Sequence, residues 1–296
     1  MQTEGDDKTS AEQKLVNFYF EEVASDWAEI YERQGVNEFV HQERLRIVLD
    51  MVGRIGLSLQ TRVLEVGCGA GFGTLAFAKM GFIIDAIDPV QAMVDATHAR
   101  ARRAGQERRV RSGLGDVHAL CFPNETFGLV LAIGVLPWLS SPEQPLQEMC
   151  RVLRPEGYLI VTVDNRWGLR QFLEPLTNPL LRPAKELARR LFRGRRPRVR
   201  AHVISLRHCD ALLDARGLEK VESVTLGFGP LSFFNREFLP SPLGLKLHYR
   251  LQAVASRGFP VLRSSGSQYI ALVKKRGVDM RGTGKMPSVA QQDRWK

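Results

Sequence analysis

The sequence has little cysteine, and its cysteines are scattered. The 296 residues include four, none within a C-x-x-C pair: Cys68, Cys121, Cys150 and Cys209. A disulfide framework or a zinc knuckle needs closely spaced cysteines, so neither is indicated. No run approaches the ~18 to 20 apolar residues of a membrane helix, and the polar, acidic start is unlike a secretory signal. We therefore expect reduced thiols and a cytoplasmic location.

Acidic residues are fewer than basic ones, 32 against 42, which gives a formal net charge of +10. The excess is local, because residues 166–200 contain eleven Lys or Arg and two Glu, a net charge of +9. A local basic patch bears on partners or substrates, whereas an even excess bears mainly on solubility. The contents of 44% hydrophobic and 25% charged residues exclude disorder over most of the chain.

Short apolar runs alternate with segments of helical spacing in the middle of the chain. We predict helices at 72–80, 91–104 and 145–153, between strands at 62–66, 82–87, 109–111, 127–133 and 158–163. A further helix at 206–216 and strands at 220–226 and 269–274 follow. This alternation is typical of βαβ units, which form a parallel sheet with helices on both faces. The sequence therefore predicts an α/β fold.

A glycine-rich stretch, residues 65–73 (EVGCGAGFG), joins the first predicted strand to the next helix. Ligands of open parallel sheets bind at the carboxyl ends of the strands, and glycine lets the backbone approach a ligand closely. The dinucleotide pattern G-x-G-x-x-G needs glycine or alanine at its sixth position. Here that position is Phe72 counted from Gly67, or Thr74 counted from Gly69. An NAD fingerprint is excluded.

The same stretch resembles motif I of the class I S-adenosylmethionine-dependent methyltransferases, E/D-x-G-x-G-x-G. The matching positions are Glu65, Gly67, Gly69 and Gly71. The resemblance covers roughly residues 18–163 and resumes over 205–274. It implies a Rossmann-like sheet of seven mostly parallel strands, with an N-terminal helical cap and a substrate-lid insertion.

The resemblance also assigns roles to residues after the second and third strands. Asp88 falls where the family has the acid that accepts hydrogen bonds from both ribose hydroxyls. Asp116 and the N–H of Val117 fall where the family holds the adenine. With Cys68 in the loop and Ile133 at the end of the fourth strand, these residues form the expected S-adenosylmethionine site. Taken singly, each acid has the alternative of an ordinary turn or helix cap.

The expected domain organisation follows from these matches. We predict one methyltransferase domain over residues 13–276, flanked by disordered ends at 1–12 and 277–296. Its expected parts are a helical cap (13–57), a cofactor-binding core (58–163), a basic insertion (164–204) and a C-terminal part of the sheet (205–276) with a second insertion (227–263).

Residues after the fourth and fifth strands limit which classes of molecule can be the methyl acceptor. Members that methylate exocyclic amines of DNA carry N/D-P-P-Y/F, where this chain has GVLPW at 134–138, so no nucleic-acid partner is expected. Metal-dependent catechol members use an acid after the fourth strand and an Asp-Asn pair after the fifth. This chain has the pair Asp164-Asn165, but Gly134 stands near the place of the first acid. We therefore interpret the pair as part of a plain turn and predict no metal site. Resemblance to small-molecule members implies an oxygen of a metabolite, sugar or lipid-linked intermediate. The alternative is C-methylation of a quinone-like ring.

The sequence identifies no firm catalytic base. His202 and His248 are candidates, because they lie where the family keeps its substrate lid and imidazole titrates near neutral pH. Trp138 is a candidate wall of the site and Trp167 a candidate contact of the acceptor, although large aromatics more often belong to the core.

Residues 180–200 place Leu187, Leu191 and Phe192 at helical spacing among cations. Such a helix lies in the headgroup plane of a membrane, so we expect peripheral association with anionic membranes or contact with an acidic acceptor. A solvated basic helix over the active site is the alternative. The rival of another class is a noncatalytic protein that keeps the fold and binds nucleic acid or membrane. Neither the acceptor nor the oligomeric state follows from the sequence.

Overall fold

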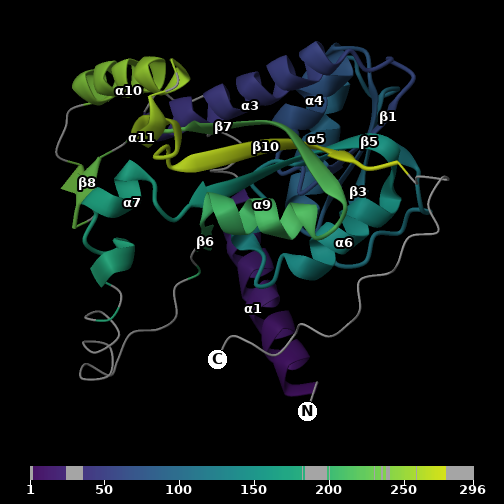
Figure 1. Cartoon of the computed structure of the whole chain (residues 1–296). Coiled ribbons are helices and arrows are strands. Elements are labelled where there is room, and N and C mark those ends of the chain that lie inside the picture. Colours follow the sequence, from purple (N-terminus) through teal and green to yellow (C-terminus); the bar gives the residue numbers. More distant parts are fainter. Residues whose placement is uncertain are drawn as a thin grey trace, which may run out of the picture.

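One large sheet organises the chain (Figure 1). In the computed structural model the described residues are 3–24, 36–181, 183, 199, 201–229, 231–234, 236–237, 241–257 and 259–277. The strands follow one another across the sheet as β3 (Val110–Leu114), β2 (Ile83–Asp88), β1 (Arg62–Val66), β4 (Phe127–Ala132), β5 (Leu153–Asn165), β10 (Gln268–Lys275) and β7 (Leu218–Leu226). β10 is antiparallel to both neighbours, and the other pairs along this path are parallel. The prediction of a seven-stranded, mostly parallel α/β sheet is confirmed, with the two-residue β6 (Val203–Ile204) added beside β5.

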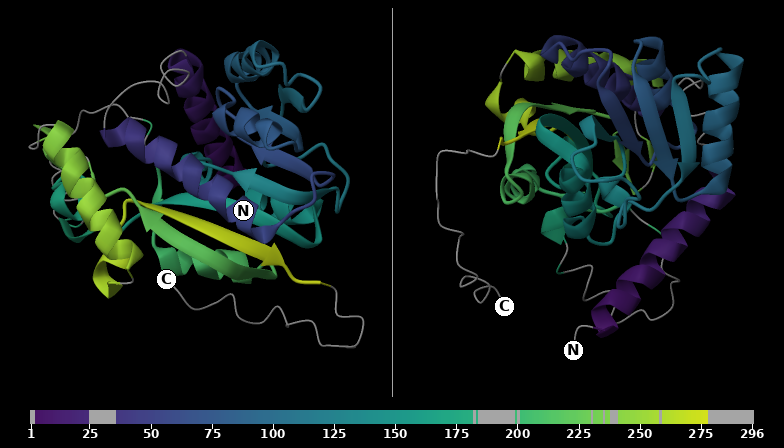
Figure 2. Two further views of the ribbon diagram at one scale, coloured as in Figure 1. Left: turned by 90° about the horizontal axis from the view of Figure 1, so that it is seen from above. Right: turned by 90° about the vertical axis from the view of Figure 1, so that its right-hand side faces the viewer.

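Helices cover both faces of the sheet (Figure 2). α3 (Val36–Ile55), α4 (Phe72–Lys79) and α5 (Gln91–Arg103) pack on one face, and α6 (Glu143–Val152) and α9 (Leu206–Asp214) on the other. A hydrophobic core lies on each face of the sheet, and β4 contributes side chains to both because successive side chains of a strand point to opposite faces. Leu129 and Leu131 pack on the α3 side, and Val130 and Ala132 pack on the α6 side. A strand covered on both faces reads as one apolar run, which explains the sequence FGLVLA.

The remaining elements extend this frame. They are α1 (Thr3–Glu22), η1 (Leu136–Trp138), α7 (Leu169–Leu173), η2 (Pro179–Leu181), β8 (Ser232–Phe233), β9 (Arg236–Glu237), α10 (Ser241–Ser256) and α11 (Pro260–Arg263). The sequence identified 227–263 only as an insertion; it contains α10, which lies beside α3 (Figure 1). Within the described part of the chain, no helix combines the length and apolarity needed to cross a membrane.

The N-terminal boundary differs from the prediction. α1 begins at Thr3, whereas the sequence placed the first regular residue at 13. Residues 3–12 contain no proline and a single glycine, so nothing in the local sequence breaks the helix. At its other end α1 is anchored on Trp138, whose ring lies 6.0 Å from that of Tyr19 and 4.9 Å from that of Phe20. Residues 278–296 of the expected tail and every basic residue of 180–200 lie outside the described residues.

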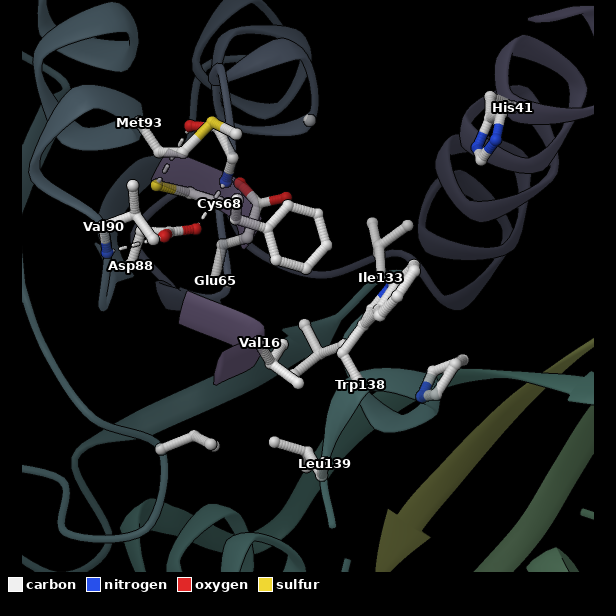
Figure 3. A pocket seen from close by; sticks show the side chains of 18 of the residues that line it. Val16, His41, Glu65, Cys68, Asp88, Val90, Met93, Ile133, Trp138 and Leu139 are labelled. Atoms are coloured by element: carbon white, nitrogen blue, oxygen red, sulfur yellow. Dashed lines mark hydrogen bonds between the residues drawn. The ribbon is translucent and has the colours of Figure 1, made fainter. Parts of the chain in front are cut away.

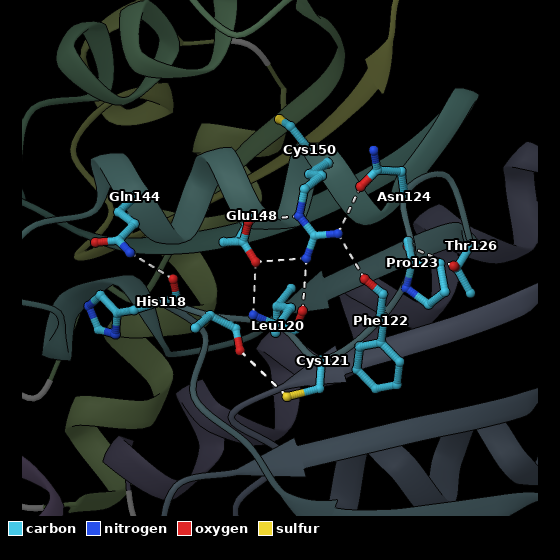
Figure 4. A network of polar contacts seen from close by, with 12 residues as sticks. His118, Leu120, Cys121, Phe122, Pro123, Asn124, Thr126, Gln144, Glu148 and Cys150 are labelled. Atoms are coloured by element: carbon cyan, nitrogen blue, oxygen red, sulfur yellow. Dashed lines mark hydrogen bonds and ion pairs between the residues drawn. The ribbon is translucent and has the colours of Figure 1, made fainter.

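The side chain of Arg151, in α6, holds the loop that precedes β4. Figure 4 shows the loop residues Leu120, Phe122 and Asn124 that it contacts. Its guanidinium donates to the carbonyls of Leu120 and Phe122, both at 2.8 Å, and to Oδ1 of Asn124 at 2.9 Å. The carboxylate of Glu148 accepts from the same guanidinium and from the N–H of Leu120, each at 2.8 Å. Because the five donors of arginine stand in a rigid fork, this network holds the chain between the third and fourth strands in one position.

Candidate active site

A cavity of about 480 Å³ lies at the carboxyl ends of the parallel strands. This volume is within the range of small-molecule sites. Figure 3 shows Glu65, Cys68 and Asp88 on one side and His41, from α3, on the other. We call the side formed by residues 65–69, 88 and 115–118 the loop end. The opposite side is called the arginine end, and its members are His41, Arg44, Asp164, Arg170, Gln171 and Gln268.

Asp88 joins the glycine loop to the second strand. Its side chain is buried, and its Oδ2 accepts the N–H of Gly69 at 2.9 Å while Oδ1 accepts the N–H of Val90 at 3.0 Å. Burial raises the pKa of Asp88 to about 6, and the two backbone N–H groups oppose that shift. Each carboxylate oxygen still has a second lone pair for a ligand hydroxyl.

Glu65 lies behind the loop, within β1. It is 3% exposed, and its Oε2 accepts from the hydroxyl of Thr74, in α4, at 2.5 Å. Burial raises its pKa to about 7, the bond from Thr74 lowers it, and the nearby charge of Asp88 raises it further. Glu65 therefore ties the strand before the loop to the helix after it.

The loop itself depends on glycine at two positions with different surroundings. Gly71 has a φ of +79°, and a Cβ there would lie 2.9 Å from the Cα of Thr97. Gly69 has a φ of +51°, and a Cβ there would meet nothing within 4 Å. Gly67, Cys68 and Gly69 line the cavity, whereas Gly71 packs behind the loop against α5. Gly71, which the resemblance places in the cofactor site, thus lies outside the lining of the cavity.

Asp116 and Val117, after β3, and Ile133, after β4, line the cavity. Oδ1 of Asp116 accepts the backbone N–H of His118 at 2.9 Å and lies 2.7 Å from Nδ1 of its ring. These contacts with His118 lower the pKa of Asp116. His118 is therefore a positioning partner of this acid.

The arginine end brings together side chains from α3, β5, α7 and β10. His41 and Arg44 are one turn apart on α3 and are buried, at 8% and 6% exposed. Asp164, at the end of β5, is the register partner of Gln268 on β10. The pKa of His41 is lowered to about 3, first by burial and then by Arg44 and Arg170. Burial raises the pKa of Asp164, and the same two arginines oppose that rise.

Neither histidine that the sequence proposed as a base lines the cavity. His248 is fully buried on α10, where its Nδ1 accepts the N–H of Phe228 at 3.2 Å and its ring packs on Phe39. His202 is exposed, and its backbone N–H donates to the carbonyl of Pro137 at 2.6 Å. Both candidates are corrected: one is a core residue and the other a surface residue.

Of the two tryptophans that the sequence suggested for the site, one lines the cavity and the other does not. Trp138 lines the cavity, between its two ends in Figure 3. Trp167 is 48% exposed and does not line it. His41 and Arg44, which the sequence analysis did not select, could have been paired from their spacing of three within the predicted helical cap at 13–57. That spacing does not show which helix face reaches the edge of the sheet.

The side chain of Asn165, the second residue of the Asp164-Asn165 pair, forms hydrogen bonds with the backbone of this chain. Its Nδ2 donates to the carbonyls of Ser264 and Gly266, both at 2.8 Å, and its Oδ1 accepts the N–H of Trp167 at 3.1 Å. At Gly134, where metal-dependent members need an acid, a Cβ would lie 3.1 Å from Nη1 of Arg44. These contacts support the turn interpretation of the pair.

Comparison with known proteins agrees with the geometry of the loop end. Residues 64–161 match the methyltransferase domain family. Over 117 residues the chain is 30% identical to methyltransferase GfsG of Streptomyces halstedii, covering 39% of this chain and 42% of that one. Over 147 residues it is 22% identical to a ubiquinone biosynthesis O-methyltransferase of Coxiella burnetii, covering 50% and 60%. The chain thus spans about half the length of these relatives.

A solved structure shows the same fold over a longer stretch. Magnesium protoporphyrin IX methyltransferase of Synechocystis PCC 6803, with bound SAH, superposes with a TM-score of 0.60 at 16% identity, covering 89% of this chain and 99% of that one. The matched residues 64–161 contain the glycine loop, Asp88, Asp116 and Ile133, which the structure gathers around one cavity. Residues 64–161 therefore carry a methyltransferase domain of the class I S-adenosylmethionine-dependent type, the type whose cofactor is S-adenosylmethionine.

Proposed function

We propose that this chain methylates an oxygen atom of a small molecule held at the arginine end of the cavity. The observation that carries the proposal is the continuity of the cavity: the family's cofactor residues line one end, and a separate polar set lines the other. An O-methyltransferase of ubiquinone biosynthesis among the relatives is consistent with this chemistry. C-methylation of a quinone-like ring is the alternative.

The residues of the loop end fit S-adenosylmethionine. Asp88 has lone pairs left for the two ribose hydroxyls, and Asp116 with the N–H of Val117 would hold the adenine. The open space at Gly69 leaves room for close approach to the backbone. When bound, the cofactor supplies an electrophilic methyl group on a sulfonium.

The arginine end has two side chains that can handle a proton. Among the described residues lining it, the titratable groups other than arginine are Asp164 and His41. We assign proton acceptance from the acceptor hydroxyl to the carboxylate of Asp164, because burial raises its pKa toward neutrality. His41, with a pKa of about 3, stays neutral and can accept a hydrogen bond. Trp138 and Leu139 exclude water from the middle of the cavity.

Methyl transfer should be detectable by mass spectrometry of small hydroxylated acceptors incubated with the protein and labelled S-adenosylmethionine. We expect EDTA to leave the rate unchanged, because Asn165 is occupied by backbone contacts. Asp164→Asn should slow transfer by about 10²- to 10⁴-fold, the usual contribution of a positioned base, with unchanged binding of S-adenosylhomocysteine. Loss of activity on chelation and its recovery with magnesium would contradict the metal-independent mechanism. Steeply salt-dependent binding of nucleic acid without methyl transfer would favour the noncatalytic rival.

We also propose that residues 180–200 associate with anionic membranes, and a cytoplasmic, membrane-peripheral location stays a prediction. Support comes from exposed apolar side chains at and before the start of this segment: Phe172, Leu176, Leu180 and Leu181 are 45%, 39%, 60% and 43% exposed. Basic residues near an anionic leaflet contribute about 1 kcal/mol each.

Liposome flotation tests this association. We expect the native chain to float with anionic but not neutral vesicles, and a variant with Arg189, Arg190, Arg195 and Arg196 changed to Ser to lose flotation. A matched control that removes four exposed arginines elsewhere, at positions 102, 103, 108 and 111, should still float. If the native chain stays unbound at low salt, the membrane proposal is wrong.

A further inference from the structure

The arginine end has an unbalanced charge. Arg44 and Arg170 carry two positive charges, Asp164 carries one negative charge when ionised, and His41 is neutral. Both arginines influence the pKa of His41 and of Asp164, so the four groups lie within one electrostatic environment. Confined charges are costly unless they are paired. Among the described residues lining this end, the net charge of +1 therefore favours a ligand with one negative charge.

The two arginines occupy different places in the cavity. Arg44 lies over Gly134, at the end of β4 and next to Ile133 of the cofactor set. Arg170 comes from α7, beyond the end of β5, and makes no ion pair within the described part of the chain. Arg44 therefore lies beside the cofactor set, and of the two arginines it acts more strongly on Asp164, whose carboxylate balances its charge. Arg170 is left for the other ligand.

Two amide side chains at this end have unused hydrogen-bonding capacity. Oε1 of Gln171 and Oε1 of Gln268 are buried, and neither has a hydrogen-bond partner among the described residues. Both residues line the cavity, and a rotation of either amide would present its shielded oxygen to a ligand hydroxyl. An unpartnered buried acceptor costs free energy that such a donor would recover.

The wall between the two ends is apolar and held in place. Trp138 is fixed by Tyr19 and Phe20 of α1, and Phe20, Val135 and Leu139 line the cavity beside it. A flat or apolar ligand body would bury its surface here.

We propose that the methyl acceptor is a small hydroxycarboxylic acid whose carboxylate pairs with Arg170, whose hydroxyl faces Gln171 and Gln268, and whose apolar body lies against Trp138. This inference rests on the proposed function and adds the substrate class. Discrimination arises because a neutral analogue would leave Arg170 confined without a counter-charge.

Calorimetry on protein saturated with S-adenosylhomocysteine tests the proposal. The probes are 4-hydroxybenzoate, 3-hydroxybenzoate and 3-hydroxyoctanoate, each compared with its own primary amide. We expect at least one acid to bind ten-fold or more tightly than its amide. Arg170→Met should remove that preference by weakening the acid alone, and Arg170→Lys should retain part of it. Arg166→Met, which removes an exposed arginine of the same segment that does not line the cavity, should leave both affinities unchanged.

The outcomes separate this inference from the proposed function. Equal or absent binding of acid and amide across all three pairs would overturn the inference, as would an Arg170→Met variant that loses affinity for S-adenosylhomocysteine instead. Methyl transfer to neutral acceptors without any preference for acids would also overturn the inference while leaving the proposed function intact. Acid-selective binding that depends on Arg170, with no methyl transfer to any bound acid, would contradict the proposed function alone.

Discussion

Replacing Asp88 with alanine is expected to weaken binding of S-adenosylhomocysteine by about ten- to one-hundred-fold. Hydrogen bonds to a charged group are worth about 1.5 to 3 kcal/mol, and about 1.4 kcal/mol corresponds to a factor of ten in affinity. The substitution also removes the bonds that the carboxylate accepts from Gly69 and Val90, which hold the loop against β2. Calorimetry on variants whose thermal unfolding shows a folded protein measures the loss.

A pH series sharpens this experiment. The pKa of Asp88 in the free protein is raised to about 6, and ligand hydroxyls favour the ionised form. Affinity should therefore be greatest above pH 6 and should fall as the pH decreases through 6, by up to about ten-fold per pH unit. Glu65, with a pKa of about 7, titrates nearby, so Asp88→Asn is needed to isolate the share that belongs to Asp88.

The matched control is Asp95→Ala. Asp95 is exposed on α5 and accepts from Nε2 of Gln91 at 2.8 Å. Its removal takes away the same charge without touching the cavity, so affinity should not change. Unchanged affinity in a folded Asp88→Ala protein would show that the ribose assignment is wrong.

Gly71→Ala is expected to lower the free energy of unfolding by about 2 to 5 kcal/mol. Left-handed backbone costs a residue with a Cβ about 1 to 2 kcal/mol, and overpacking costs about 1 to 3 kcal/mol. Both apply, because φ is +79° and the new methyl would lie 2.9 Å from the Cα of Thr97. That Cα is backbone and cannot rotate away, so α4 and α5 must separate. Denaturant unfolding measures the change.

Gly69→Ala is the comparison for this experiment. Its φ of +51° carries the same kind of strain, but nothing lies within 4 Å of the new methyl. We expect a loss of only about 1 to 2 kcal/mol from the backbone. Because Gly69 lines the cavity, the methyl should instead weaken binding of S-adenosylhomocysteine. Equal destabilisation by the two substitutions would contradict the assignment of Gly71 to packing and of Gly69 to the ligand.

The sheet and the loop end could be predicted because their signals are local. β4 is one uninterrupted apolar run, and such a run predicts a strand that is covered on both faces. The glycine loop follows β1, Asp88 ends β2 and Asp116 lies two residues after β3. Parallel strands bring their carboxyl ends to one edge. Sequence order alone was enough to place these residues around a common cavity.

The histidines show where local signals fail. His248 and His41 are both buried, yet His41 lines the cavity while His248 packs against Phe39 and Phe228. Spacing within a helix does not distinguish them, because burial depends on which neighbouring element covers that face. The sequence predicted a helical cap over residues 13–57 but not which end of α3 reaches the sheet edge.

The sequence by itself determined the α/β architecture and the cofactor loop, since periodicity and a contiguous motif act over a few residues. Only the tertiary structure decided the arginine end. Arg44, Arg170 and Gln268 are separated by about a hundred residues or more, and they meet because β10 inserts antiparallel beside β5 while α3 crosses the same sheet edge. Such a set has no spacing to detect, because contacts between distant segments are created by packing of the core and not by local chain preference.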